Sequence, residues 1–175
     1  DFLLSYRSLL QRAIDIIWKN ITWVEKREEK CYEVESGRKR KKRCYQIKRL
    51  IPELPKTREF KNQLRKELLK GWVYASHYVD SAIKVAYSIL GSWRRNYING
   101  ERRREKPTVK KLFVRVKETL YTYKNGKIRV TIVPRKLYLE FDLSKAWFKN
   151  KVKGLDLGEL ILTKNELIIT FRRPK

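Results

Sequence analysis

The sequence predicts an α+β protein, with a helical lobe that carries a charged hairpin, followed by a small antiparallel β-barrel of the OB-like type. Apolar residues recur at helical spacing over residues 1–106, and a charge-dense segment interrupts them at about residues 25–51. From Pro107 the apolar period changes to two, as in half-buried strands. We therefore expect a helical lobe over 1–106 and an antiparallel β domain over 107–175.

The charge of the chain limits the classes of partner. Its 175 residues include 44 Lys and Arg against 19 Asp and Glu, a net charge of +25, while 42% hydrophobic residues suffice for a packed core. The many positive charges repel one another in the folded chain, and such an excess indicates a polyanionic partner. No apolar run approaches the roughly 20 residues that span a bilayer, and nothing resembles a signal peptide. We expect a cytoplasmic, nucleoid-associated protein that binds no membrane.

Two segments of the lobe have an apolar stripe at helical spacing. The first predicts a helix over Phe2–Val24. The second predicts one long helix within Leu54–Gly100, with Thr57 as its N-cap. Gly71 marks a point where that helix could kink, although the stripe continues in phase across it. The two stripes predict an antiparallel helical pair.

The segment between these helices reads as a hairpin that turns near Gly37. If residue i pairs with residue 75 minus i, opposite charges face each other and Cys31 lies opposite Cys44. Strands fit this pattern better than a helical hairpin, which remains the alternative. A disulfide between the two cysteines is compatible with the register, whereas a zinc site would need more ligands than two cysteines and one histidine.

Basic residues gather in two places. One is the hairpin tip, which is either a solvated loop or a set of phosphate contacts. Its residues are Arg38, Lys39, Arg40, Lys41, Lys42 and Arg43. The other is the end of the long helix and the segment after it, where aromatic residues alternate with arginines. There we expect phosphate contacts from Arg94, Arg95, Arg102, Arg103, Arg104, Lys106, Lys110 and Lys111. Trp93 and Tyr97 either stack on bases or pack the helix end.

Short strands separated by tight turns follow Pro107. Asn125-Gly126 is a strong hairpin signal, and Lys164-Asn165 marks a second turn. The strands are expected at residues 112–116, 119–123, 127–133, 137–143, 160–163 and 167–171. Such a set is typical of small barrels that bind single-stranded nucleic acid.

One motif suggests chemistry. Asp156, in Gly154-Leu-Asp-Leu-Gly158, resembles the first metal-binding strand of RNase H-like nucleases. Metal-dependent cleavage requires at least one further carboxylate beside it, and only Glu159 and Glu166 follow. No glycine-rich phosphate loop and no Ser-His-Asp set is present, so we expect a binding module without catalytic residues, metal or small-molecule substrate.

Several stretches resemble the N-terminal half of the archaeal TnpB (OrfB-type) family, which are transposon-encoded RNA-guided endonucleases. They are SWRRNYINGERRREKP (92–107), VKKLFVRVKETL (109–120), KIRVTIVPRKLYLEFDLS (127–144) and the final GELILTKNELIITFRR. The resemblance implies a helical recognition lobe inserted into a wedge barrel. In the family a barrel strand precedes the lobe; its absence here implies an N-terminal truncation.

The resemblance also implies nucleic-acid partners and a separate catalytic domain. The partners would be a guide RNA and DNA, gripped by backbone and shape while base pairing reads sequence. The catalytic domain, with its divalent metal (Mg²⁺), would follow Lys175. The alternative is a stand-alone DNA- or RNA-binding protein of the architectural or ribosome-associated kind.

Overall fold

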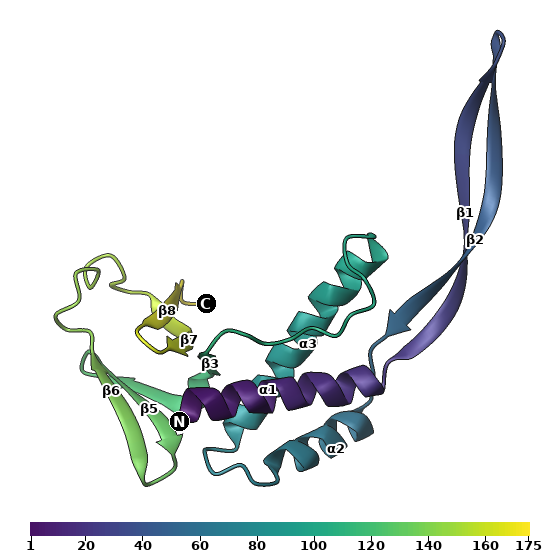
Figure 1. Ribbon diagram of the computed structural model, residues 1–175. Coiled ribbons are helices and arrows are strands. Elements are labelled where there is room, and N and C mark those ends of the chain that lie inside the picture. Colours follow the sequence, from purple (N-terminus) through teal and green to yellow (C-terminus); the bar gives the residue numbers. More distant parts are fainter.

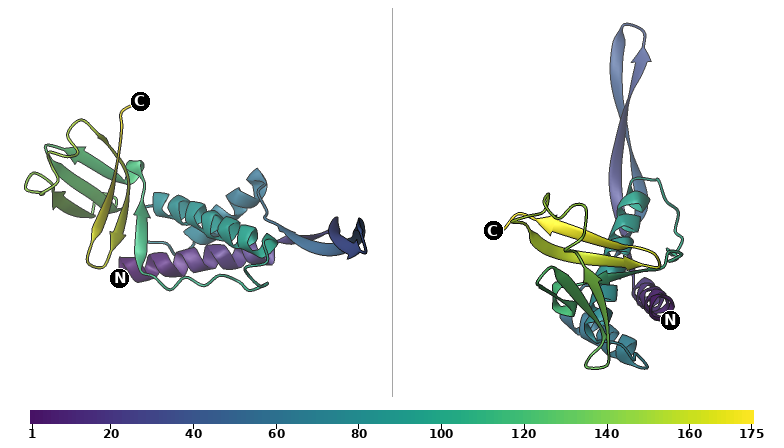
Figure 2. Two further views of the ribbon diagram at one scale, coloured as in Figure 1. Left: turned by 90° about the horizontal axis from the view of Figure 1, so that it is seen from above. Right: turned by 90° about the vertical axis from the view of Figure 1, so that its left-hand side faces the viewer.

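The computed structural model describes residues 1–175 as three helices and eight strands. In chain order these are α1 (Phe2–Lys19), β1 (Thr22–Ser36), β2 (Lys39–Glu53), α2 (Arg58–Leu69), α3 (His77–Ile98), β3 (Phe113–Val116), β4 (Tyr121–Lys124), β5 (Lys127–Val133), β6 (Leu137–Asp142), β7 (Asp156–Thr163) and β8 (Leu167–Arg172). The helices form the centre, the β1–β2 hairpin projects from one end, and the remaining strands lie at the other (Figures 1 and 2).

The single long helix expected within Leu54–Gly100 is wrong, because residues 70–76 separate α2 from α3. Gly71 has a φ of +75°, a left-handed conformation that ends helices and that glycine adopts without a steric penalty. The apolar spacing at Leu68, Ala75 and Val79 stays in phase across the break, so periodicity alone could not reveal it. Thr57 caps α2 as expected, accepting a hydrogen bond from the Phe60 amide at 3.3 Å.

The first helix ends at Lys19, earlier than the expected Val24. Asn20 caps it, and the strand β1 already begins at Thr22. The residues after Asn20 include Ile21, Thr22 and Val24, whose branched side chains favour strands. They extend β1 down to the helices.

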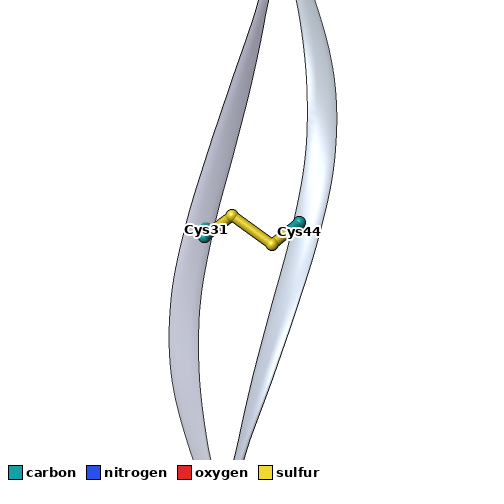
Figure 3. The surroundings of a disulfide bond; sticks show 2 residues. All are labelled: Cys31 and Cys44. Atoms are coloured by element: carbon teal, nitrogen blue, oxygen red, sulfur yellow. A yellow bond between two sulfur atoms is a disulfide. The ribbon is translucent and has the colours of Figure 1, made fainter.

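The hairpin is a pair of 15-residue strands, and the predicted register is confirmed. Cys31 lies opposite Cys44, and a disulfide joins them across Cα atoms 4.0 Å apart (Figure 3). The turn follows from Gly37 at φ +64°, which suits the first central position of a two-residue type II′ turn. We call residues 25–50 the arm, because most of this hairpin extends away from the helices and the other strands (Figure 1).

No closed barrel forms in the C-terminal part, which corrects that expectation. The strands instead make two separate three-stranded antiparallel sheets, β3-β7-β8 and β4-β5-β6. A one-turn 3₁₀ helix at Glu118–Leu120 redirects the chain between β3 and β4, so these consecutive strands join different sheets. The expected Asn125-Gly126 turn is present, with both residues at positive φ.

The helices and both sheets share one hydrophobic core. It includes Leu10 and Ile14 of α1, Leu90 of α3, and residues of both sheets such as Ile128 and Leu160. The expected division at residue 106 therefore crosses a continuous packed interior. Buried hydroxyls also link the two parts, because Ser81 donates to the Arg115 carbonyl at 2.6 Å. Tyr78 likewise donates to the Thr131 carbonyl at 2.6 Å.

Candidate nucleic-acid interface

The end of α3 is built around a buried indole. Trp93 is only 3% exposed, and its ring meets Trp18 edge-on at 4.7 Å and stacks on Tyr97 at 5.4 Å. Its Nε1 donates to the Arg103 carbonyl at 3.1 Å. In this arrangement Trp93 packs within the protein and fixes the segment after α3, instead of presenting a free face to a base.

The base of the arm is held on the same helix end. Arg94 donates to the Pro52 carbonyl at 2.7 Å and pairs with Glu53 at 3.2 Å. In return, Arg49 donates to the carbonyls of Tyr97 and Ile98 at the C-terminus of α3. A guanidinium at these carbonyls also complements the negative end of the helix dipole. Arg94 is thus engaged in holding the arm.

The segment after α3 runs back along α1. The side chain of Gln11 donates to the Pro107 carbonyl at 3.3 Å and accepts from the Val109 amide at 2.8 Å. Lys106 pairs with Asp15 at 2.9 Å. Burial would raise the pKa of Asp15, but hydrogen bonds from Gln11 and Lys106 outweigh it and lower that pKa. These contacts fix the backbone from which the basic side chains project.

The remaining basic residues at the end of α3 and in the segment after it divide into two groups. Arg104 lies over the ring of Trp23, 3.9 Å from its centroid, and so helps to cover the aromatic cluster. The others are exposed and form no ion pair within the chain: Arg95, Arg102, Arg103, Lys110 and Lys111. We call these five residues the junction cations.

A pocket of about 510 Å³ opens between α3 and the returning segment, and two of the junction cations, Arg102 and Lys110, line it. Its lining includes Ser92, Asn96, Arg102, Lys106 and Lys110, with Glu105 as its acidic member. Amide and hydroxyl groups beside cations are the usual ligands of phosphate and sugar oxygens. The pocket therefore has the chemistry to hold a nucleotide of a polyanionic chain.

The second basic region, Arg38 to Arg43, lies at the far end of the arm and is not brought to the junction (Figures 1 and 2). All six residues are exposed. Arg40 lies 3.8 Å from Glu33 and 3.7 Å from Glu35, so part of this charge is balanced within the arm.

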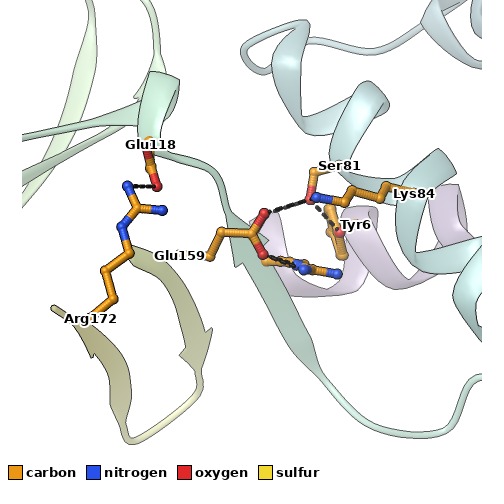
Figure 4. Close-up of polar contacts among 7 residues, drawn as sticks. Tyr6, Ser81, Lys84, Glu118, Glu159 and Arg172 are labelled. Atoms are coloured by element: carbon orange, nitrogen blue, oxygen red, sulfur yellow. Dashed lines mark hydrogen bonds and ion pairs between the residues drawn. The ribbon is translucent and has the colours of Figure 1, made fainter. Parts of the chain in front are cut away.

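Asp156, the candidate metal ligand, begins β7 and is exposed, opposite Arg172. The nearby Glu159 instead binds Arg115, and Lys84 at 3.3 Å (Figure 4). Burial would raise the pKa of Glu159, but its hydrogen bonds with Arg115 and Lys84 lower it. Glu29, Cys31 and Cys44 are the side chains that lie close enough together to share a metal ion. The sulfurs of the two cysteines are, however, bonded to each other. These residues do not fit a catalytic Mg²⁺ site, which requires several oxygen ligands.

Sequence reasoning did not single out a third basic and aromatic region. The loop after β6 exposes 81% of Trp147, with Lys151 above its ring at 4.9 Å. Lys149 and Lys153 line a pocket of about 300 Å³ beside Phe148. The spacing of lysines around Trp147-Phe148, without an acidic residue, was the available signal.

Comparison with known proteins places the chain in a family. A family model described as the uncharacterized protein MJ0013 family matches residues 2–131. The chain belongs to this family. It is 55% identical over 134 residues to the uncharacterized protein MJ0013 of Methanocaldococcus jannaschii, covering 75% of the chain and 81% of that protein.

A second relative extends the similarity to the C-terminal sheets. The TnpB-like protein MJ1635 of the same archaeon is 43% identical over 173 residues, 98% of this chain. The chain spans 36% of the length of that relative. No solved structure matches the chain significantly. None of the three helices has both the length and the apolar character needed to cross a bilayer.

Proposed function

We propose that this chain is the nucleic-acid-binding portion of a TnpB-like, transposon-associated, RNA-guided DNA endonuclease. It would grip a guide RNA and the guide–target duplex through their backbones. The similarity to the TnpB-like protein MJ1635 over 98% of the chain supports the assignment. The net charge of +25 supports a polyanionic partner. Cleavage, and the Mg²⁺ that it requires, would belong to residues outside this chain.

The observation that carries the proposal is the set of junction cations at and after the end of α3, two of which line the pocket there. Their backbone is fixed by Gln11, Asp15 and Trp93, so the cations are positioned before a partner arrives. They have no acidic partner to give up, so binding phosphates would not require breaking an ion pair. A preordered cation set binds phosphates with a smaller entropic cost than a mobile tail does.

The test compares two triple variants in fluorescence anisotropy with a labelled stem-loop RNA. Arg95→Gln, Arg102→Gln and Lys110→Gln remove three charges at the junction. Lys56→Gln, Arg58→Gln and Lys66→Gln remove three exposed, unpaired charges at the start and on the outer face of α2. We expect the junction variant to lower the slope of log affinity against log salt by about 2 to 3, and the control to change it little. Equal losses in both variants, or wild-type binding insensitive to salt, would refute the proposal.

A second candidate function is a basic DNA- or RNA-binding protein that acts without a nuclease. It is favoured by MJ0013, of which the chain covers 81%, because that family member is itself not much larger than the matched region. RNA that copurifies with the chain, expressed together with the DNA flanking its gene, separates the two. Enrichment of one structured RNA transcribed beside the gene supports the RNA-guided function; unselected cellular RNA supports the second.

A further inference from the structure

The arm contacts the helices at its lower end, where Arg49 donates to the carbonyls of Tyr97 and Ile98, and the rest of it projects into solvent. From Glu25 to Leu50 its residues are exposed or half-buried, and its buried part begins at Ile51, in the base. A two-stranded hairpin alone is marginally stable in water. The arm is instead held by its backbone ladder, by the Cys31–Cys44 disulfide and by ion pairs across the strands. It is therefore a defined two-faced ribbon.

The register assigns each side chain of the arm to one of two faces, because opposite residues share a face and neighbours along a strand alternate. We call the face that contains Cys31 and Cys44 the disulfide face. Its charges balance, since four acidic residues share it with four basic ones. These residues are Glu25, Glu29, Glu33 and Glu35 with Arg27, Arg40, Lys42 and Lys48.

The opposite face, which we call the tyrosine face, is strongly basic. Its charged residues are Lys26, Lys30, Lys39, Lys41, Arg43 and Arg49, with Glu28 as the single acid. The alternation of side chains along β2 therefore divides the basic run of Arg38 to Arg43 between the two faces of the arm. Lys39, Lys41 and Arg43 lie on the tyrosine face, whereas Arg40 and Lys42 lie opposite glutamates on the disulfide face.

Two aromatic side chains stand at the centre of the basic face. Tyr32 is 50% exposed and Tyr45 is 51% exposed, and their rings meet edge-on at 6.0 Å. Arg43 lies directly opposite Tyr32, and Lys30 directly opposite Tyr45. Large exposed aromatic rings flanked by cations contribute nothing to the core. They are the composition of a surface that contacts both the bases and the phosphates of a nucleic acid.

We propose that the tyrosine face of the arm binds in a groove of duplex DNA. The inference rests on the proposed nucleic-acid-binding function and adds the site and the form of the partner. A two-stranded β-ribbon fits the major groove of B-DNA, which is about 12 Å wide. The basic residues of this face other than Arg49, which is held by the C-terminus of α3, would contact phosphates at the groove walls while Tyr32 and Tyr45 contact base edges.

The length and the one-sided charge of the arm both favour a duplex. At roughly 3.3 Å per residue, a twelve-residue free strand extends about 40 Å, comparable to one turn of B-DNA at about 34 Å. A single charged face suits a partner approached from one side. Double-stranded RNA fits less well, because its deep and narrow major groove excludes side chains.

The test uses two double variants of the full 175-residue chain, kept oxidised so that the disulfide remains. Lys41→Gln with Arg43→Gln removes two charges from the tyrosine face. Arg40→Gln with Lys42→Gln removes two from the disulfide face, on the same strand and at adjacent positions. Affinity is measured by anisotropy for one sequence as duplex DNA, duplex RNA and single-stranded DNA, over a range of salt.

We expect the tyrosine-face variant to lower the salt slope for duplex DNA by about 2 and the affinity by at least tenfold. The disulfide-face variant should change affinity less than threefold. Tyr32→Ala with Tyr45→Ala should weaken duplex DNA binding without changing the salt slope. Equal losses in the two charge variants, or a larger effect on duplex RNA or single strands, would overturn the inference.

The two proposals fail in distinguishable ways. If the wild-type chain binds RNA and DNA through the junction cations but the tyrosine-face variant binds duplex DNA as the wild type does, only the arm inference is lost. If the wild-type chain binds no nucleic acid, the proposed function fails and the arm inference with it.

Discussion

The helical body and the arm are held together by different forces. In the body, α1, α3 and both sheets bury a common set of aliphatic side chains, and buried hydroxyls such as that of Ser81 are all hydrogen-bonded. The arm has no such interior. Its strands are joined by backbone hydrogen bonds, one disulfide and ion pairs between exposed side chains.

Because of this difference, substitutions in the two regions are expected to have different effects on stability and on binding. Substitutions in the body act on the free energy of unfolding, because they remove buried contacts. Substitutions in the arm leave that free energy nearly unchanged, since exposed ion pairs contribute little. The side chains of the arm are therefore free to serve a partner. The end of α3 and the segment after it combine both kinds of residue, since Trp93 is buried and Arg102 is exposed.

The largest expected effect tests the aromatic cluster. Trp93→Ala removes a buried indole that contacts Trp18 and Tyr97 and donates to the Arg103 carbonyl. We expect a loss of about 3–5 kcal/mol in the free energy of unfolding, measured by urea denaturation. Tyr32→Ala, an aromatic truncation in the arm, is the control and should cost less than about 0.5 kcal/mol. Similar losses in both variants would mean that the arm packs on the body.

A smaller and local effect is expected from reducing the Cys31–Cys44 disulfide. Closing a loop of this size contributes roughly 3 kcal/mol in the chain-entropy model. Because the disulfide lies far along the arm from the contacts of Arg49 with α3, that contribution should appear as faster amide exchange in β1 and β2 alone. Exchange in α1 and α3 should be unchanged. A drop in the thermal midpoint of the whole protein on reduction would contradict this separation.

The smallest expected effect concerns Glu159, which joins the helices to the sheets by binding Lys84 and Arg115. Glu159→Gln should cost about 2 kcal/mol at neutral pH, because two cations lose their partner. The pKa of Glu159 is lowered on folding, so its stabilisation is present above the unfolded pKa near 4.5 and is lost as pH falls through the folded value.

The measurement is a series of urea denaturations of the wild type and Glu159→Gln from pH 7 to pH 3. The difference between them should shrink below about pH 4.5, the ordinary pKa of glutamate. Arg40→Gln, which removes an exposed partner of Glu33 and Glu35, provides the arm control with no measurable loss. A constant difference between wild type and Glu159→Gln across the series would exclude the ion pairs as its source.

Local rules sufficed where neighbouring residues determine the structure. Gly37 and the facing charges define the arm, and Asn125-Gly126 defines the β4–β5 turn. Local rules failed where two local signals disagreed, as the apolar spacing and the glycine do around Gly71. The stripe through Leu68 and Ala75 continues in phase across residues 70–76, yet Gly71 ends α2 there. The barrel prediction failed because strand spacing does not specify which strands pair.

The sequence by itself determined the charge, the α+β class, the hairpin register and the two segments where basic residues gather. Only the tertiary structure decided which of those basic residues are free. Lys106 is paired by Asp15, and Arg94 by the Pro52 carbonyl and Glu53, residues distant in sequence. Arg95, Arg102 and Lys110 have no such partner within the chain. Whether a cation is available to a phosphate depends on contacts between segments far apart in the chain. Such contacts cannot be predicted from the residues next to the cation in the sequence.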